Sequence, residues 1–271
     1  VCSRAELSKV SPARRSRSRG RSQKPAVRLF AFDRGHDVRF VAGADEAGRG
    51  CLAGPLVVAA VCLDLDAIRG RRRRQLSDLD DSKRLSREQR EQLFEAVMTN
   101  ADCVSVHVAS ARRIDRDGLH RTNLRLMAEA LRAVDHRAER CLVDGFHLGQ
   151  GAPEHSRVVG GDRRSASIAA ASVVAKVSRD RLMAGPMAAA HPEFGFDKHV
   201  GYATPEHRAA IRRHGPSPLH RMSFDSLAYR EDSQLAQPPG SARGADGETT
   251  TPAHEGCAGP EPDRPAVGSP G

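Results

Sequence analysis

The alternation of apolar and polar positions predicts interleaved strands and helices between about residues 40 and 214. Four short apolar runs bounded by turn residues predict β-strands: 40–44, 55–63, 102–109 and a run ending at 144. Four segments with helical spacing or small side chains predict helices: 87–98, 123–134, 166–190 and 205–213. The helix at 87–98 begins with a capping box, because Gln89 follows Ser86 by three residues. These elements indicate one α/β domain with a mixed sheet.

Two adjacent carboxylates, Asp45 and Glu46, stand between the first apolar run and Gly48-Arg49-Gly50. Neighbouring side chains of a strand point to opposite faces, so we expect the pair to share one site only where the strand ends. Arg49 offers several donors to a phosphate, and the glycines let the backbone approach a bulky anion. The segment therefore indicates metal-dependent phosphodiester chemistry. A solvated loop is the alternative for an acid pair before a glycine turn.

Two further acids end apolar runs in the second half of the chain. Asp144 follows Cys141-Leu142-Val143, and Asp162 follows Val158-Val159-Gly160-Gly161. Separate segments that each deliver a carboxylate are what a two-metal site requires, because the acids hold two cations about 3.5–4 Å apart. Oxygen ligands favour Mg²⁺ or Mn²⁺ over Zn²⁺. The small side chains after residue 165 would let the next helix lie close to the sheet.

These motifs, in this order, closely resemble those of the bacterial ribonuclease HII family, the type 2 ribonucleases H. The matching segments lie between about residues 39 and 229: 43–50 with 53–55, 81–86, 143–145, 161–162, 169–172, 175–181, 199–204 and 214–224. Two positions depart from the family. Gly160 and Val200 stand where it usually has lysine, and we expect the change to weaken contacts to the substrate backbone.

The resemblance implies the ribonuclease H-like fold, a mixed β-sheet flanked by helices with a helical C-terminal part. It implies an endoribonuclease that cuts the RNA strand of RNA–DNA hybrids. The same enzyme would cut 5′ of single ribonucleotides embedded in duplex DNA, leaving 3′-hydroxyl and 5′-phosphate ends. Two divalent ions, Mn²⁺ or Mg²⁺, would be held by four catalytic acids. In the family pattern Asp45 bridges both ions, Glu46 and Asp144 complete one site, and Asp162 holds the ion nearer the attacking water.

Substrate choice requires groups aimed at the 2′-hydroxyl of RNA. Backbone groups of Gly48, Arg49 and Gly50 can serve, and the ring of Tyr202 can stack on a sugar or base. In the family this tyrosine reads the junction between a ribonucleotide and the following deoxynucleotide. A packed ring at a helix start is the structural alternative for Tyr202.

Several other polar residues are interpreted mainly as structural. Three histidines without mutual metal spacing are interpreted as structural residues or phosphate contacts: His191, His199 and His220. Asp180, between Arg179 and Arg181, is interpreted as a salt-bridged structural acid. Asp80 and Asp81 would shape a loop.

Two alternatives to this function remain. The related type 3 enzyme is the nearer one, but we expect no extra folded N-terminal domain, and the glycine-arginine-glycine segment is present. A non-catalytic, basic nucleic-acid-binding protein is the alternative from another class. It would have no reason to keep four carboxylates where phosphates approach.

Charge is unevenly distributed along the 271 residues, which carry a net charge of +9. Residues 1–28 hold nine Lys and Arg against Glu6 alone, whereas 231–271 hold seven acids against two arginines. We expect a disordered basic extension at 1–35, a catalytic domain at 36–230 and a disordered Gly/Pro-rich acidic tail at 231–271. The Arg-Ser run at 14–21 would attract nucleic acid through counterion release or be a solvated extension. The arginines at 69–74 would lie in a loop that grips the duplex or is merely solvated.

Six cysteines show no paired metal-ligand spacing, and no apolar stretch is long enough to cross a membrane. The first residues lack the apolar core of a secretory signal. We expect a reduced, cytoplasmic monomer without membrane contact, whose partners are RNA–DNA hybrids and ribonucleotide-containing duplex DNA.

Overall fold

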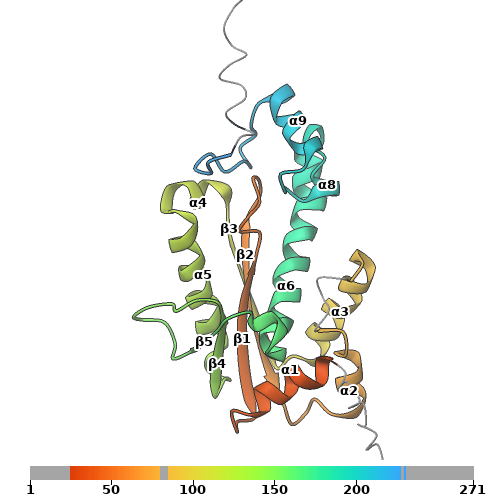
Figure 1. The fold of residues 1–271 in the computed structure, drawn as a ribbon, viewed down its shortest axis with the longest axis vertical. Coiled ribbons are helices and arrows are strands. Elements are labelled where there is room, and N and C mark those ends of the chain that lie inside the picture. Colours follow the sequence, from red (N-terminus) through yellow and green to blue (C-terminus); the bar gives the residue numbers. More distant parts are fainter. Residues whose placement is uncertain (1–24, 80–84, 227–228, 230–271) are drawn as a thin grey trace, which may run out of the picture. The chain divides into compact units, whose positions relative to one another are not determined.

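The predicted apolar runs form a five-stranded sheet in the computed structural model, which describes residues 25–79, 85–226 and 229. The strands are β1 Phe40–Ala47, β2 Leu56–Asp64, β3 Cys103–Ala109, β4 Arg140–Asp144 and β5 Ser156–Val158. Their order is β3-β2-β1-β4-β5 (Figure 1). β1 pairs antiparallel with β2 and parallel with β4, so the sheet is mixed, as predicted.

Helices cover both faces of this sheet. Alternate residues of β1 enter two different cores: Val41 packs in the core that contains α6 (Ala166–Leu182), and Ala42 packs in the core of α5 (Leu119–Val134). Figure 1 shows α5 and α6 on opposite sides of the strands. The small side chains of α6 let it lie directly on β1 and β2, as the sequence indicated.

The remaining helices are short or lie beside α6. They are α1 Pro25–Arg34, α2 Gly70–Gln75, α3 Arg87–Asn100, α4 Ala111–Asp117, α7 Ala188–Ala190, α8 Phe196–His199 and α9 Pro205–His214. Short 3₁₀ and π turns accompany them: η2 Gly161–Arg163, η3 Met183–Met187 and η4 Pro192–Phe194. The capping box of α3 is present, with the hydroxyl of Ser86 accepting from the amide of Gln89. Among the described helices, none has the length and apolar character needed to span a membrane.

Two expectations about the fold are wrong. The range expected to be a disordered extension contains α1, in which Leu29 and Phe30 are fully buried. The carboxylate of Asp33 in α1 accepts the amide of Ser167 at 2.9 Å, so this helix caps the first turn of α6. The arginines expected in a loop form α2, none of whose residues is buried. The Arg-Ser run, the acidic tail and the pair Asp80 and Asp81 lie outside the described residues.

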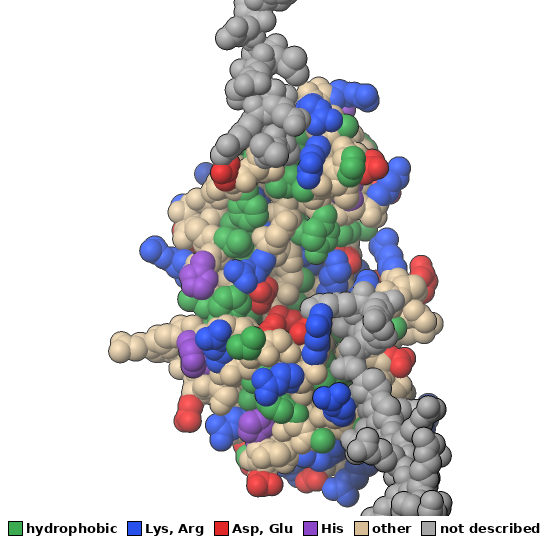
Figure 2. Space-filling model, viewed as in Figure 1, with side chains coloured by type: hydrophobic (Ala, Val, Ile, Leu, Met, Phe, Trp, Pro, Cys, Tyr) green, Lys and Arg blue, Asp and Glu red, His purple; other side chains and the backbone are tan. Residues whose placement is uncertain are grey.

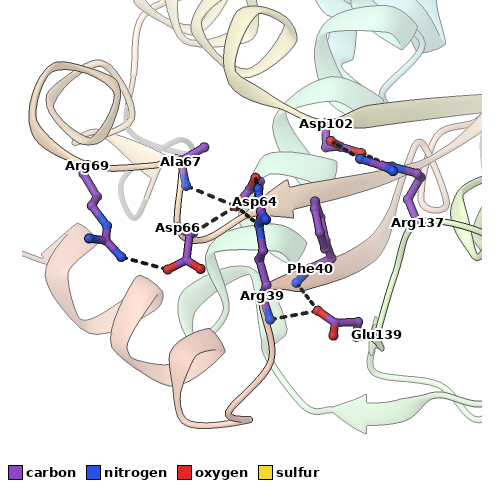
Figure 3. A network of polar contacts seen from close by, with 9 residues as sticks. All are labelled: Arg39, Phe40, Asp64, Asp66, Ala67, Arg69, Asp102, Arg137 and Glu139. Carbon is purple, nitrogen blue, oxygen red and sulfur yellow. Dashed lines mark hydrogen bonds and ion pairs between the residues drawn. The ribbon is translucent and has the colours of Figure 1, made fainter.

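Ion pairs tie the strands together at the end of the sheet where β1 begins (Figure 3). Asp64 accepts Arg39 Nη2 at 2.6 Å, and Asp102 accepts Arg137 Nε at 2.7 Å. The guanidinium groups lower the pKa of both carboxyls. Glu139 accepts the backbone amides of Arg39 and Phe40, which fixes the start of β4 against β1. Exposed pairs of this kind contribute little free energy but help to set the register.

Candidate active site

Register places two of the expected acids on neighbouring strands. β1 and β4 are parallel, with Ala44 opposite Val143, so Asp45 and Asp144 are the next residues on each strand. Since register partners in a sheet share a face, both acids project toward α6. β1 itself continues to Ala47, so the expectation that this strand ends at the acid pair is wrong. Its pairing with β4 stops at Ala44, which leaves an open strand edge beside the acids.

The acids act on one another electrostatically. Asp45 is buried, and its pKa lies well above the usual value. Burial is the largest cause, and the charges of Glu46 and Asp144 raise the pKa further. The amide of Glu46 donates to Asp45 Oδ1 at 2.7 Å, and Ser172 of α6 also stabilises the Asp45 carboxylate. Burial raises the pKa of Glu46 too, while Arg49 lowers it. Although Arg49 lies at ion-pair distance from Glu46, the charges of the three carboxylates oppose one another, so the group favours the binding of additional positive charge.

Asp162 joins this group through the backbone of its neighbour. Gly161 donates its amide to Asp144 Oδ1 at 2.7 Å, and a Cβ at Gly161 would lie 2.5 Å from Ile168 Cδ1. This contact holds the turn η2, which contains Asp162, against both β4 and α6. The structure therefore brings Asp45, Glu46 and Asp144 together directly and Asp162 beside them.

The donor set fits a divalent ion. Among the described residues, Glu46 Oε2 is buried with no partner at hydrogen-bond distance and angle, although the side chain of Asn123 lies close enough to lower the pKa of this carboxyl. A buried carboxylate oxygen without a donor has the position and charge of a metal ligand. All four acids offer oxygen ligands, which suit Mg²⁺ or Mn²⁺.

One compact group of metal-ligand type occurs in the part of the chain that the structure describes: Cys62, Asp102 and Cys103, with ligand atoms within 4.8 Å of one another. Arg137 already bonds both Asp102 oxygens, and burial raises the pKa of both thiols, so this group is poorly suited to a cation. The side-chain oxygens of the four predicted acids do not all lie within 4.8 Å of one another. Two ions about 4 Å apart with ligands at about 2 Å would span roughly 8 Å, so a wide spread suits a two-ion site.

Two buried arginines, Arg179 and Arg221, hold the loop that contains Gly48, Arg49 and Gly50. Arg179 donates to the carbonyls of Pro55, Ala53 and Val200 at 2.9–3.0 Å. Arg221 donates to the carbonyls of Gly54 and Arg49 at 3.0 and 3.1 Å. Neither role was predicted from the sequence. Arg179 follows Ser172 and Lys176 at helical spacing, and that stripe could have identified it.

The close packing of this loop explains why one of its positions is occupied by glycine. A Cβ at Gly48 would lie 2.1 Å from Arg179 Nε, and its φ of +95° is a conformation that side chains disfavour. Gly50 has open space around it. Arg49 lies with Nη1 3.4 Å from Glu46 Oε1 and its guanidinium 4.8 Å above the ring of Phe146.

Tyr202 borders a cavity of about 310 Å³ beside the acids. The cavity is lined by Glu46, Ala47, Gly48, Arg90, Ser172, Val173, Lys176 and Tyr202. Tyr202 is 43% exposed, and Lys176 Nζ lies 5.4 Å from its ring centre. Lys176 also binds Asp180 at 2.8 Å, so Asp180 is salt-bridged as expected, although to this lysine rather than to the adjacent arginines. Figure 2 shows acidic side chains near the middle of the drawn face with basic side chains around them.

Residues 42–227 match the family model described as Ribonuclease HII. A curated Ribonuclease HII from Sinorhizobium fredii (strain NBRC 101917 / NGR234) is 49% identical over 197 residues, covering 72% of this chain and 81% of the relative. One from Sinorhizobium medicae (strain WSM419) is 48% identical over 205 residues, covering 74% and 91%. The solved ribonuclease H2 from Pyrococcus horikoshii OT3 superposes with a TM-score of 0.61 at 25% identity, covering 73% of this chain and all of that one.

Proposed function

The chain belongs to the ribonuclease HII family, type 2 ribonucleases H acting on RNA–DNA hybrids, and we propose that it also cuts 5′ of single ribonucleotides in duplex DNA. The proposed reaction is two-metal-ion hydrolysis that leaves 3′-hydroxyl and 5′-phosphate ends. The observation that carries the proposal is the Asp45 carboxylate. Burial raises its pKa most, and the charges of Glu46 and Asp144 raise it further rather than neutralise it.

We propose that Asp45, Glu46, Asp144 and Asp162 hold two Mn²⁺ or Mg²⁺ ions, with Asp45 shared between them. When bound, the ions would supply an activated water and charge stabilisation at the leaving oxygen. The chain's own groups orient these ligands. The Glu46 amide and Ser172 fix the Asp45 carboxylate, and the Gly161 amide fixes Asp144. Arg49 and Lys176 would balance the charge of the phosphodiester that enters the cavity.

We propose that the Gly48–Gly50 backbone and Tyr202 read the ribonucleotide. Support comes from the open space at Gly50 and from the exposed ring of Tyr202 on the same cavity. Lys176 lies against one side of that ring, which leaves the exposed part for a sugar or base. The geometry favours this over the alternative that Tyr202 is only a packed ring.

The first test is cleavage of a duplex that carries one ribonucleotide, with Mn²⁺ or Mg²⁺. Asp162→Asn is expected to abolish cleavage and leave hybrid binding largely intact, because it removes a metal ligand's charge but keeps its shape. Asp197→Asn, at an exposed position of α8, is the matched control and should cleave normally. Near-normal turnover of Asp162→Asn with Mg²⁺ would remove Asp162 from the site.

A second prediction concerns substrate choice. Tyr202→Ala should reduce cutting at a single embedded ribonucleotide by about 5- to 150-fold, the range for one lost stacking contact. The loss on long hybrids should be smaller, because many registers and 2′-hydroxyl contacts compensate. Tyr202→Phe keeps the ring and is the conservative control, whereas Arg49→Ala should weaken both substrates. Equal losses of kcat/KM on the two substrates for Tyr202→Ala would mean that junction reading lies elsewhere.

A further inference from the structure

Three buried histidines pack together in the helical C-terminal part: His199, His207 and His220. The rings of His199 and His207 stack with their centres 4.4 Å apart. His207 Nε2 lies 3.1 Å from His220 Nε2, within hydrogen-bond distance. From the sequence, His199 and His220 were expected to be structural residues or phosphate contacts, and no role was expected for His207. Their burial excludes direct phosphate contact.

The partners of the outer ring nitrogens determine where each proton lies. The backbone amide of Ser217 donates to His220 Nδ1 at 2.9 Å, so that nitrogen is an acceptor without a proton. His207 Nδ1 lies 2.8 Å from the carbonyl of Tyr202, which can only accept, so Nδ1 carries the proton. In neutral rings this leaves Nε2–H on His220 and a bare Nε2 on His207. His220 therefore donates to His207, and His207 donates to the Tyr202 carbonyl.

Both rings must be neutral for this chain of hydrogen bonds. Burial lowers the pKa of each to about 4. Neighbouring histidines contribute to this lowering: His207 and then His191 and His199 lower the pKa of His220, and His199 lowers that of His207. At neutral pH the pair is thus an uncharged, one-directional relay. A proton on either ring would place two N–H groups face to face.

The relay links the two segments that carry the proposed substrate contacts. His220 forms an antiparallel bridge with Ala53. On either side of it, the amide of Arg221 donates to the carbonyl of Leu52 and the amide of Gly54 donates to the carbonyl of Leu219, both at 2.8 Å. The His220 end is therefore fixed to the loop that continues Gly48–Gly50. The other end reaches the backbone of Tyr202 itself.

The turn before Tyr202 needs such support. Val200 has a φ of +44°, a left-handed conformation that a β-branched residue adopts only when its surroundings impose it. A Cβ at Gly201 would lie 2.4 Å from the carbonyl of Ala53, so this turn touches the same loop. Without a fixed carbonyl at Tyr202, the strained turn could relax and move the ring.

We propose that His207 and His220 are positioning residues for substrate choice, which hold the Tyr202 backbone in register with the glycine-arginine-glycine loop. The inference rests on the proposed role of Tyr202. Neither histidine touches substrate or metal. Their contribution is a directional hydrogen-bond relay that fixes where the Tyr202 ring stands relative to the cavity.

The relay itself can be tested without activity. Long-range ¹H–¹⁵N NMR of the histidine rings in the full chain at pH 7 reports which nitrogen carries the proton. Single His→Gln variants assign the signals. We expect His220 protonated at Nε2 and His207 at Nδ1. The opposite tautomer of either ring, or a charged ring at pH 7, would overturn the relay.

Two substitutions of His207 separate its two contacts. The amide nitrogen of His207→Asn occupies the region of Nδ1 and can still donate to Tyr202. The amide oxygen of His207→Gln occupies the region of Nε2 and can still accept from His220, but the Tyr202 contact is lost. We expect His207→Gln to lower the ratio of kcat/KM for a single embedded ribonucleotide to that for a long hybrid. The expected loss is about 2- to 12-fold, the range for one hydrogen bond. His207→Asn should lower the ratio less, because it keeps the contact to Tyr202 and loses only the contact by which His220 orients the side chain.

The matched control is His214→Gln, at the exposed last residue of α9, which should leave the ratio unchanged. Equal ratios for His207→Asn, His207→Gln and the wild type would overturn the positioning role. An unchanged ratio in Tyr202→Ala would instead refute the proposed role of Tyr202. The tautomers seen by NMR would still decide whether the relay exists.

Discussion

Asp45→Asn is expected to abolish cleavage and to raise the melting temperature of the metal-free protein. The first effect follows from losing the ligand shared by both proposed ions. Metal stabilisation of the transition state is worth several kcal/mol, which corresponds to a loss of about 10³-fold or more. The second effect follows from burial, because Asn fills the same space without placing a charge beside Glu46 and Asp144.

The pH dependence of the stability gain has a definite sign. The pKa of Asp45 is raised in the folded protein, so the native state binds more protons than the unfolded state above the ordinary carboxyl pKa of 3.8. The free energy of unfolding therefore falls as pH rises from that value through the folded pKa. Asp45→Asn removes this loss, so its advantage in melting temperature should be largest at neutral and alkaline pH and should vanish in acid.

Thermal unfolding at several pH values, with and without divalent metal, checks this prediction. In a domain of this size each kcal/mol corresponds to about 2–4 °C. Metal should stabilise the wild type, by about 2.7 kcal/mol at a hundredfold excess over Kd, and should leave Asp45→Asn almost unchanged. Asp66→Asn, at an exposed carboxylate, is the control and should alter neither quantity. A lower melting temperature for metal-free Asp45→Asn at pH 8 would contradict the account of a repulsive buried charge.

The central strands and the closeness of Asp45 to Asp144 could be predicted because both follow from local patterns. Apolar runs identify β1, β2 and β4. Asp144 directly follows such a run, and Asp162 follows another after two glycines. The parallel register of β1 with β4 then brings Asp45 next to Asp144, and this pairing needs no contact beyond neighbouring strands. The end of β1 was misplaced, because β2 continues to pair with it past the point where β4 stops.

Contacts between distant segments account for what the sequence could not predict. The helix α1 could not be recognised from the sequence because the N-terminal region around it is rich in arginine. Its Leu29 and Phe30 are buried only because α6 and the sheet cover them. Arg179 and Arg221 look like surface charges in sequence. Both side chains are fully buried. They donate hydrogen bonds to backbone carbonyls that lie more than a hundred residues away in the sequence. Hydrogen bonds to carbonyls leave no pattern in the sequence of the accepting residues.

Gly43→Ala is expected to be the most destabilising single-methyl change in the sheet. An added Cβ would lie 2.2 Å from the amide nitrogen of Ile168 and 2.3 Å from the carbonyl carbon of Ser167. Both are backbone atoms of the first turn of α6, so no side-chain rotation can relieve the contact. α6 would have to move away from β1 as a unit, although its small side chains pack it closely there.

The free energy of unfolding is expected to fall by about 3 kcal/mol or more, the upper end of the usual range for overpacking. This corresponds to a fall in melting temperature of roughly 6–12 °C. Activity should fall as well, because α6 carries Ser172 against the Asp45 carboxylate. Thermal and urea unfolding measure the first effect, and cleavage well below the melting temperature measures the second. Gly185→Ala, where a Cβ meets open space, is the matched control. If Gly43→Ala melted within about 2 °C of the wild type, less than 1 kcal/mol would be involved, and the close contact of α6 with β1 would not be what holds Ser172 beside Asp45.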